Sequence, residues 1–420
     1  MARLAIIGAG ITGLGAAREL HDRGHDVQVF EADSRIGGHT HTVKVTLDGR
    51  ERAIDTGFIV YNERTYPNFI ALLDRLGIQR QATTMGFSVT DEGGDFEYAG
   101  TNLATLAPSW KLKFSLSHWR MIRDIVRFNR RVKADLKADQ IEPALTLGDY
   151  LARHRFSEAF VQRYLLPMGA AIWSTPESNM REFEALFFAR FFYNHGLLEI
   201  QDRPQWFTLI GGSQAYLEPL TAPFADNIRC AAAVARVTTS GECVGVELAN
   251  GESFEFDGVV MACHSNQTAR LLSDPTPAQA ALLNAVPYLG NEVVMHTDAS
   301  LMPAHRSCWA AWNYMLQSKH PEQPLLTYYM NELMCLDDPV DFFVTVNPEC
   351  RIDPAKVLST HHYAHPQFSP ESPAAQAQLA ATNAGQRVVL AGAWARNGFH
   401  EDGYTTGLEA AAALDASVRG

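Results

Sequence analysis

The sequence lacks the cysteine spacing of a disulfide framework, a redox dithiol or a zinc ribbon. Its six cysteines are scattered along the second half of the chain without a C-x-x-C pair, a distribution that suits reduced thiols in a cytosolic protein. Positive charge is also scarce, since 35 Lys and Arg stand against 47 Asp and Glu and the net charge is −12. No nucleic-acid partner is therefore expected, because proteins that bind duplexes carry a basic surface that displaces phosphate counterions.

Long apolar runs are missing as well. No stretch reaches the roughly 18 apolar residues that a membrane-spanning helix needs, although attachment to a membrane surface stays open. The apolar start, Leu4 to Ala17, contains glycines at fixed spacing and has neither the charged first region nor the cleavage site of a signal peptide. We therefore expect a cytoplasmic protein, with peripheral attachment at the inner face of the membrane as an alternative.

The N-terminus carries a glycine-rich turn in a complete strand and helix context. Leu4 to Ile7 is typical of a parallel strand buried on both faces, and it leads directly into Gly8-Ala9-Gly10-Ile11-Thr12-Gly13. The spacing of apolar residues predicts a helix from about Thr12 to Arg23 and a second strand over Asp26 to Phe30. Glu31 follows that strand. This order is typical of a dinucleotide-binding βαβ unit.

Each glycine of the turn has a physical task. Gly8 permits the tight turn, Gly10 lets backbone approach a pyrophosphate, and Gly13 lets the helix pack close to the strand. The helix N-terminus supplies amides and a dipole for phosphate charge. Glu31 is placed to accept hydrogen bonds from an adenosine ribose, and its charge disfavours the 2′-phosphate of NADP.

The next residues, Arg35-Ile36-Gly37-Gly38, resemble the extension found in the flavin amine oxidase and phytoene desaturase superfamily. The resemblance implies that these residues contact the diphosphate of a non-covalently bound FAD. His39 stands where the family usually has a second arginine, and Thr40 or Thr42 takes the family's hydroxyl position. Asp55 to Phe58, with Gly57, resembles the loop that returns toward the flavin, while a plain Asx-type turn is the alternative.

Two later segments match the same superfamily. Val234, followed by the strand Gly258 to Ala262, resembles the segment that lays a valine near the adenine. Arg387 to Gly392 reads as a last buried strand, with Ala393 where the family has an acidic residue. Gly403 to Gly407 then resembles the final motif, in which a helix N-terminus faces the flavin N1 and C2 carbonyl.

These motifs predict an α/β fold. A glutathione-reductase-like FAD-binding Rossmann domain (1–80, 205–270 and 385–420) would be interleaved with an α+β substrate domain of mixed sheet and helices (81–204 and 271–384). The candidate FAD-binding residues are Gly8, Gly10, Ile11, Thr12, Gly13, Glu31, Ala32, Arg35, Gly37, Gly38, His39, Thr40, Gly57, Val234, Gly392, Ala393, Gly403, Tyr404 and Thr405.

The segment Trp110 to Lys137 is basic and amphipathic in an otherwise acidic chain. Such a segment suits attachment to an anionic membrane surface, or guidance of a substrate with a phosphate or carboxylate head. A surface helix whose apolar side joins the core is the plainer alternative. The aromatic block Phe183 to Tyr193 likewise fits either core packing or the wall of a long apolar substrate tunnel.

Four segments add to a whole-chain resemblance: Ala171 to Ser174, Pro204 to Trp206, Gly211 to Ser213 and Thr327 to Asn331. They resemble a bacterial group of NAD/FAD-binding proteins. Members are often associated with cyclopropane-fatty-acid-synthase-like methyltransferases, and some desaturate methylated acyl chains. The resemblance implies an apolar lipid or acyl substrate.

A missing lysine bears on the reaction. Polyamine and monoamine oxidases of the superfamily place a lysine near flavin N5, in a strand that here resembles Val293 to Thr297, yet no lysine occurs between Lys137 and Lys319. His296 lies in that neighbourhood instead. No cysteine lies beside His361 to Phe368 for a covalent flavin link. A second glycine-rich motif for NADPH is absent too, so electrons would pass to dioxygen or a quinone, or return to the substrate.

The candidate catalytic residues are Tyr404, His400, Arg396 and His296. Tyr404 would pack beside the flavin, and Arg396 would anchor an acyl carboxylate. One of His400, Glu401 and Asp402 would accept a proton, with a plain polar loop at the domain edge as the alternative. The close histidines His39 and His41, and the cluster from His361 to His365, form weak ligand sets, so no metal site is expected.

We expect an FAD-dependent desaturase, or a related dehydrogenase or isomerase, of a long-chain lipid such as a modified fatty acyl chain. An amine oxidase releasing hydrogen peroxide, and a non-catalytic flavin-binding partner of a lipid-modifying enzyme, are the alternatives.

Overall fold

A computed structural model describes residues 1–241, 243–317 and 323–419. At its centre lies a five-stranded sheet whose paired strands all run parallel. In spatial order its strands are β10 (Ile228–Arg229), β2 (Asp26–Phe30), β1 (Arg3–Ile7), β14 (Gly258–Met261) and β20 (Val388–Leu390). The bounds of β1 and β2 agree with those that the apolar pattern predicts to within one residue.

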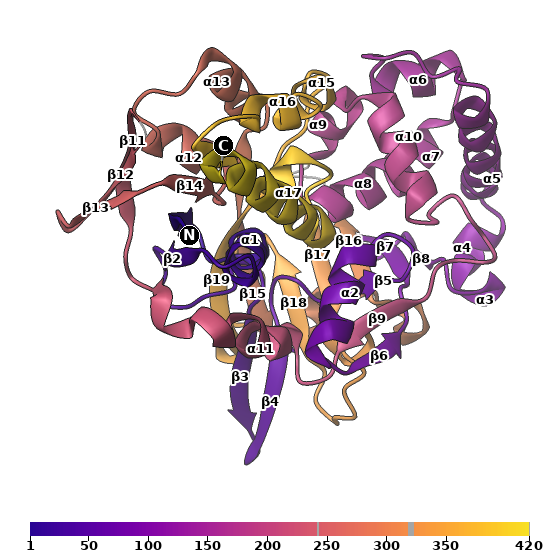
Figure 1. The fold of residues 1–420 in the computed structure, drawn as a ribbon. Coiled ribbons are helices and arrows are strands. Elements are labelled where there is room, and N and C mark those ends of the chain that lie inside the picture. The colour runs from indigo at the N-terminus through magenta and orange to yellow at the C-terminus, as the bar shows by residue number, and fades with distance from the viewer. Residues whose placement is uncertain (242, 318–322, 420) are drawn as a thin grey trace.

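Alternate residues of this sheet belong to two different cores. Leu4 and Ile6 pack with the helices α1 (Ile11–Asp22) and α17 (His400–Arg419), which contact each other closely (Figure 1). Ala5 and Ile7 face the other core. There Phe30 contacts the rings of Phe254 and Phe256, which belong to a three-stranded antiparallel sheet. That sheet comprises β11 (Val234–Ser240), β12 (Cys243–Leu248) and β13 (Ser253–Phe256). Burial on both faces explains the continuous apolar runs of the strands.

A seven-stranded mixed sheet forms the second half of the molecule. Its pairs are antiparallel except for β16 beside β7. In spatial order its strands are β19 (Val357–Pro366), β15 (Tyr288–His296), β18 (Phe343–Val346), β17 (Leu325–Tyr329), β16 (Trp312–Leu316), β7 (Phe87–Asp91) and β8 (Glu97–Ala99). Two smaller sheets are β3 (Thr42–Leu47) with β4 (Arg50–Asp55), and β5 (Tyr61–Asn62), β9 (Trp206–Leu209) and β6 (Arg80–Thr83).

Helices gather in a lobe at one end of the seven-stranded sheet (Figure 1). The lobe contains α3 (Leu103–Leu106), α4 (Trp110–Lys113), α5 (Leu116–Lys137), α6 (Leu147–Arg153), α7 (Glu158–Phe160), α8 (Leu166–Trp173), α9 (Glu177–Glu182) and α10 (Ala185–Asn194). The other α-helices are α2 (Pro67–Leu76), α11 (Leu217–Thr221), α12 (Ser265–Leu271), α13 (Pro277–Asn284), α14 (Met330–Leu333), α15 (Ser372–Gln376) and α16 (Leu379–Asn383). The predicted α/β class is thus confirmed, whereas the division into two domains stays a prediction.

The basic segment forms two helices rather than one. Ser115 interrupts it and caps α5 by accepting a hydrogen bond from the His118 amide. Met121, Phe128 and Val132 bury one face of α5 in the core, so the middle of α5 is an ordinary surface helix. In the described part of the chain, no helix is both long and apolar enough to cross a membrane.

Candidate active site

A cavity of about 770 Å³ extends from the glycine-rich turn to the helical lobe and the seven-stranded sheet. Its size falls within the range of ligand and cofactor sites. On the side of the parallel sheet, the candidate FAD-binding residues that line it are Gly8, Gly10, Ile11, Thr12, Glu31, Ala32, Arg35, Gly37, Gly38, His39, Gly57, Val234, Gly392 and Ala393. Residues of the first and middle motifs therefore meet in one cavity with Gly392 and Ala393, which follow β20.

The three glycines of the turn have the geometry that a dinucleotide cradle needs. Gly8 has φ of +104°, in the region that favours glycine. A Cβ on Gly13 would lie 1.9 Å from the Gly8 carbonyl oxygen, so a side chain there would push α1 away from the strand. A Cβ on Gly10 would meet no protein atom within 4 Å. The space next to Gly10 is part of the cavity, where a diphosphate can approach the first turn of α1.

Glu31 is held firmly at the carboxyl end of β2. Its two carboxylate oxygens accept hydrogen bonds from the Ala9 amide at 2.6 Å and from the Asp33 amide at 2.9 Å. The carboxylate lines the cavity next to Ala32. This is the position from which an acidic residue binds an adenosine ribose.

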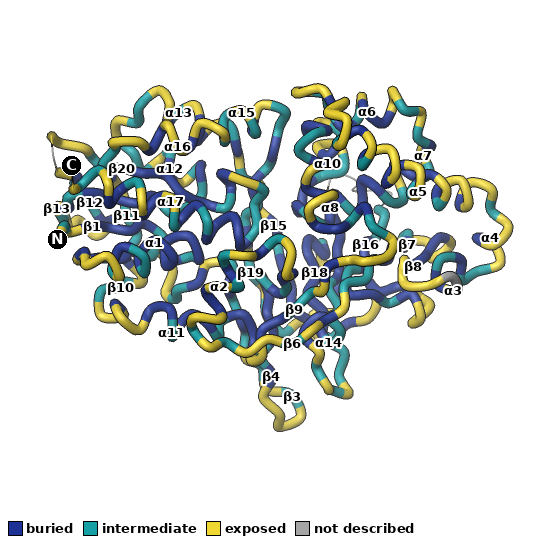
Figure 2. The backbone as a smooth tube through the Cα atoms, turned by 45° about the vertical axis from the view of Figure 1, so that its right-hand side comes forward, coloured by how far each residue is buried: buried dark blue, intermediate teal, exposed yellow. Residues whose placement is uncertain are grey.

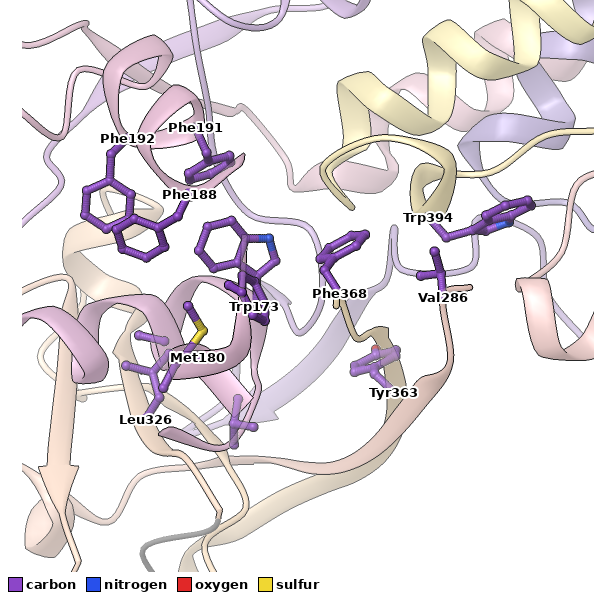
Figure 3. Close-up of a cluster of buried hydrophobic side chains, with 14 of the residues drawn as sticks. Trp173, Met180, Phe188, Phe191, Phe192, Val286, Leu326, Tyr363, Phe368 and Trp394 are labelled. Carbon is purple, nitrogen blue, oxygen red and sulfur yellow. The ribbon is translucent and has the colours of Figure 1, made fainter. Parts of the chain in front are cut away.

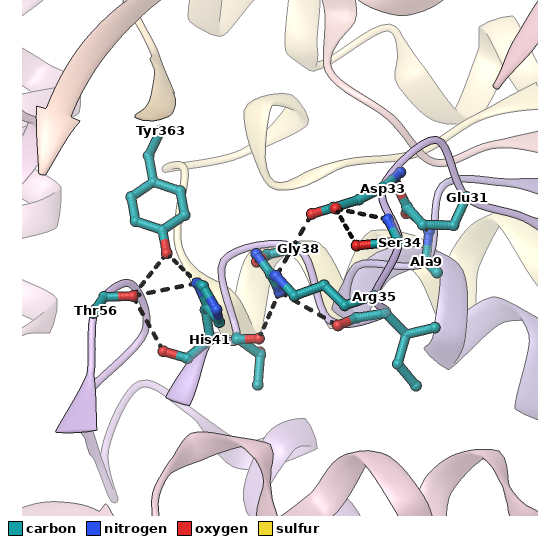
Figure 4. A network of polar contacts seen from close by, with 11 residues as sticks. Ala9, Glu31, Asp33, Ser34, Arg35, Gly38, His41, Thr56 and Tyr363 are labelled. Carbon is teal, nitrogen blue, oxygen red and sulfur yellow. Dashed lines mark hydrogen bonds and ion pairs between the residues drawn. The ribbon is translucent and has the colours of Figure 1, made fainter. Parts of the chain in front are cut away.

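Arg35 shapes the loop of paired glycines (Figure 4). Its guanidinium donates to the carbonyl oxygens of Gly38 at 2.8 Å and Thr40 at 3.3 Å, and it lies 3.5 Å from the Asp33 carboxylate. Gly37 and Gly38 both have positive φ, of +109° and +57°. The arginine thus stabilises a loop conformation available to glycine and keeps positive charge on the cavity wall.

The C-terminal helix begins earlier than the sequence predicts. It starts at His400, so Gly403 and Gly407 lie inside α17 and not in a preceding loop. A Cβ on Gly407 would lie 2.4 Å from the Thr12 carbonyl oxygen, and one on Gly403 would lie 2.8 Å from the Thr12 hydroxyl. Both glycines therefore allow α17 to pack closely on α1.

This earlier start changes the direction of three candidate residues. Tyr404 is buried against Gly15 of α1, since a Cβ on Gly15 would lie 2.7 Å from its ring. Tyr404 does not line the cavity, nor do Gly403 and Thr405. The expectation that Tyr404 packs beside the flavin does not match this position. Gly13 and Thr40 likewise support the cavity wall without lining it.

His400 does line the cavity and is held from two sides. Its ring stacks on Phe58 at 3.8 Å, and its Nε2 lies 2.9 Å from the Tyr216 hydroxyl, which also contacts the Thr40 hydroxyl. Burial lowers the pKa of His400 to about 3. The ring is therefore neutral at physiological pH, and its role as a proton acceptor stays a prediction.

The other two candidate catalytic residues lie off the cavity wall. His296 is buried within the seven-stranded sheet, where its Nε2 lies 2.7 Å from the Thr345 hydroxyl. Arg396 forms an ion pair with Glu409 on α17. It borders a second, polar opening beside the first turns of α2 and α17. Neither residue is placed to touch a substrate in the main cavity.

The half of the cavity opposite the glycine-rich turn is apolar and aromatic. Helices of the lobe contribute Met168, Ile172, Trp173 and Phe191, together with Tyr164, and the seven-stranded sheet contributes Phe87, Trp312 and Tyr328. In the aromatic block, Phe188 and Phe191 pack against Trp173 (Figure 3). Phe183, Phe188 and Phe192 are fully buried core residues, whereas Phe191 lines the cavity.

Two polar residues of this half were not singled out from the sequence. His195, at the end of α10, donates from Nδ1 to the Phe191 carbonyl oxygen at 3.0 Å, which leaves Nε2 as the acceptor nitrogen. Burial lowers its pKa to about 4. Arg203 is exposed at the cavity wall, with Nε donating to the Glu199 carbonyl oxygen. Both residues follow the aromatic helix α10 in the sequence. No local sequence pattern indicated that they line the cavity.

Histidines also gather around His39, which directly follows the paired glycines. His39, His264 and His365 line the cavity, and burial lowers the pKa of each, to about 4, 3 and 3. These rings are neutral at physiological pH. Within the residues that the structure describes, no group of three or more His, Cys, Asp or Glu side chains is arranged to hold a metal ion.

Comparison with known proteins identifies the family. A profile described as flavin containing amine oxidoreductase matches residues 11–415. The chain belongs to this family. Flavin-containing amine oxidase A of Sus scrofa is 23% identical over 281 residues, which cover 64% of this chain and 51% of that protein. The chain thus spans about half the length of the curated relatives that it matches.

Solved structures of similar fold cover nearly the whole chain. Cyclohexylamine oxidase from Brevibacterium oxydans IH-35A has a TM-score of 0.71 at 18% identity, with 100% of both chains covered. A CLA-producing fatty acid isomerase from P. acnes has a TM-score of 0.67 at 15% identity, with 97% of both chains covered. At these identities the likeness concerns the fold.

Family membership and the glycine cradle agree on the cofactor. The family contains flavin, and the open space at Gly10, the fixed Glu31 carboxylate and the Arg35 loop fit the phosphates and ribose of a dinucleotide. The predicted cofactor, FAD, is therefore confirmed. Which atoms of FAD each residue contacts stays a prediction.

Proposed function

We propose that this protein is an FAD-dependent oxidoreductase that desaturates a long-chain lipid, such as a modified fatty acyl chain. The observation that carries the proposal is the chemistry of the substrate half of the cavity. Apart from polar residues such as His195 and Arg203, its described lining is apolar and aromatic. It contains no lysine, and the only carboxylate on the whole described wall is Glu31 at the ribose end. An acyl chain fits such a lining, because burial of each CH₂ group contributes about 0.8 kcal/mol.

The residues of the cavity support this reaction. Bound FAD would supply the hydride acceptor. The rings of Trp173, Phe191 and Trp312 would hold the acyl chain and exclude water. His195 presents an unprotonated Nε2 and would accept the proton lost from the neighbouring carbon as the double bond forms. The two electrons would then pass to dioxygen or a quinone.

Arg203 supplies the polar end of the proposed substrate site. Its guanidinium lies near the half-buried Tyr164, where it opposes the rise that desolvation causes in the pKa of that phenol. A carboxylate or phosphate head could bind to the guanidinium while the acyl chain enters the aromatic half. This replaces Arg396, which is already paired with Glu409.

Amine oxidation is the second candidate, and the family match and the names of several relatives favour it. The lining of the cavity argues against it. No described wall residue is a lysine, and β15, the strand expected to carry that lysine, reaches the cavity through Tyr288 alone. An alkylammonium would lose its hydration in the aromatic half without a carboxylate to pair with, although aromatic faces would offset part of that cost.

Anaerobic reduction of the flavin tests the proposal. The FAD-loaded protein is mixed with methyl-branched fatty acids, their phospholipids, and a matched panel of primary and secondary amines, and the flavin absorbance is followed. Bleaching by acyl lipids and not by amines is expected. Bleaching by amines alone would replace the proposal with amine oxidation. Bleaching by neither would favour a non-catalytic flavin-binding partner of a lipid-modifying enzyme.

The flavin link is proposed to be non-covalent. Cys263 is the one cysteine on the described cavity wall, and its sulfur lies 3.2 Å from the Thr268 hydroxyl. Burial raises the pKa of this thiol to about 11, so it is protonated and a poor nucleophile. Acid precipitation should therefore release all of the flavin into the supernatant, and retention of flavin in the pellet would contradict this.

A further inference from the structure

The end of the helical lobe exposes an unusual set of apolar side chains. Of the eleven large apolar side chains that are strongly exposed in the described structure, four lie between residues 110 and 119. Trp110, Phe114 and Leu116 are 74, 77 and 89% exposed, and Trp119 is 43% exposed. We call residues 110–123, comprising α4 and the first two turns of α5, the α4–α5 tip. It lies at the end of the molecule far from both termini (Figure 2).

The α4–α5 tip holds these side chains in a defined structure. Ser109 and Ser115 cap α4 and α5. The Trp119 indole donates to the Lys113 carbonyl oxygen at 2.9 Å, and the rings of Trp110 and Phe114 stack at 5.7 Å. Trp119 is therefore held by a local hydrogen bond, whereas Trp110 and Phe114 stack on each other at the end of two capped helices.

Positive charge surrounds the exposed rings. Between residues 110 and 131 the chain has seven Lys and Arg and a single acidic residue, Asp124. Asp124 is buried, where it accepts a hydrogen bond from the Ser157 amide and pairs with Arg127. Lys111 pairs with Asp95, whereas Lys113 and Arg120 have no ion-pair partner among the described residues. This local charge is opposite to the net charge of −12.

We propose that the α4–α5 tip docks the protein on an anionic lipid bilayer. Trp110, Phe114 and Leu116 enter the interfacial region, and Lys113 and Arg120 contact the headgroups. Indole and phenyl rings at such a position favour the boundary between headgroups and acyl chains. The basic residues oppose the repulsion between an acidic protein and an anionic surface, and each contributes about a fivefold gain in binding. The proposal goes beyond the reaction and does not depend on lipid turnover.

The geometry favours a bilayer over a protein partner. The α4–α5 tip projects at one end of the molecule (Figure 2), and its apolar residues lie on one turn of α4 and the start of α5. A projecting tip of this kind can enter a fluid interface without a shape-complementary cavity opposite it. It belongs to the helical lobe that also lines the substrate half of the cavity.

Flotation of the FAD-loaded full chain with vesicles tests the proposal. Vesicles of phosphatidylcholine with one quarter phosphatidylglycerol are compared with pure phosphatidylcholine, at low salt and at 0.5 M NaCl. Binding is expected on anionic vesicles and should weaken at least about tenfold at high salt, because the charges are exposed. Equal binding to both vesicle types, or no binding to either, would overturn the proposal.

Matched variants assign the binding to the tip. Trp110→Ser/Phe114→Ser and Lys113→Glu/Arg120→Glu should each lower vesicle binding at least about tenfold, while flavin content and Tm stay at the values of the unmodified protein. Ile210→Ser/Val357→Ser and Lys44→Glu/Arg50→Glu alter exposed residues elsewhere and should leave binding unchanged.

Two outcomes would overturn the assignment. One is wild-type vesicle binding by either tip variant. The other is light scattering that shows a dimer which Trp110→Ser/Phe114→Ser dissociates, since the tip would then be an interface between two copies of the chain. Because no step measures turnover, failure of the lipid-oxidation proposal would leave these results unaffected.

Discussion

Replacement of Gly10 by alanine should weaken FAD binding without lowering the stability of the apoprotein. Gly10 has φ of −76° and ψ of −179°, an extended conformation that alanine adopts freely. The added methyl group would meet no protein atom within 4 Å. The apoprotein should therefore keep its stability or gain about 0.4 to 1 kcal/mol, because alanine reduces the conformational freedom of the unfolded chain.

The same methyl group should weaken FAD binding. It projects into the cavity at the first turn of α1, where the diphosphate must approach the backbone amides. Loss of one hydrogen bond to a charged phosphate costs about 1.5 to 3 kcal/mol, which corresponds to a Kd about 10- to 150-fold higher. Urea unfolding of the apoprotein and titration of flavin fluorescence would measure the two effects separately.

Gly13→Ala is the matched control. Its Cβ would lie 1.9 Å from the Gly8 carbonyl oxygen, so the apoprotein itself should lose about 3 kcal/mol or more of its unfolding free energy. The reasoning is refuted if Gly10→Ala binds FAD as tightly as the unmodified protein. It is also refuted if Gly10→Ala destabilises the apoprotein as strongly as Gly13→Ala does.

Three further changes test the cavity and the first turn of α17. His195→Gln should lower the rate of flavin reduction by lipid about 100-fold or more while FAD binding is unchanged, since it removes the proposed proton acceptor; an unchanged rate measured by stopped flow would exclude that role. Arg203→Ala should raise KM for acyl substrates with a free carboxylate about tenfold or more and leave KM for their methyl esters nearly constant; an equal rise for both would exclude head-group binding. Asp402 is buried, and burial raises its pKa to about 6, above the value in the unfolded chain. The protonated carboxyl therefore stabilises the fold at low pH, and the unfolding free energy should fall by about 3 kcal/mol as the pH rises from about 4 to 6. Asp402→Asn should lack this loss in urea titrations of the apoprotein at pH 4 and 7, and parallel pH profiles of the two proteins would contradict it.

The flavin half of the molecule could be predicted in detail because its signals are local. The apolar run ending at Ile7, the glycines from Gly8 and the acid at Glu31 lie within one βαβ unit, and β1, α1 and β2 have the expected bounds to within one residue. The parallel sheet then brings the later strands β14 and β20 to the same edge.

The start of α17 could not be predicted in the same way. Gly403 and Gly407 read as turn residues in the sequence, yet in the structure they allow contact between two helices. The observed start at His400, ahead of both glycines, directs Tyr404 to α1 and His400 to the cavity. Nothing local in the sequence distinguishes a glycine of a turn from one at a helix contact.

The substrate half depends on contacts between distant segments. His195, Trp312 and Tyr328 meet in one cavity because β16 pairs with β7 and the helical lobe packs beside them. Such pairings depend on tertiary packing. The hydrophobic periodicity of a single sequence indicates local helices and strands but not which distant segments pair. The sequence therefore indicated aromatic residues that suit a substrate site, but it did not show which of them line the cavity.

The most direct test combines flavin reduction with analysis of the lipid product. The FAD-loaded protein is incubated without oxygen with one equivalent of a methyl-branched acyl lipid, and both the flavin absorbance and the lipid mass are measured. Desaturation predicts one lipid product, lighter by about 2 Da, for each flavin reduced. A flavin that stays oxidised with every acyl lipid, but is reduced by an amine, would contradict the account.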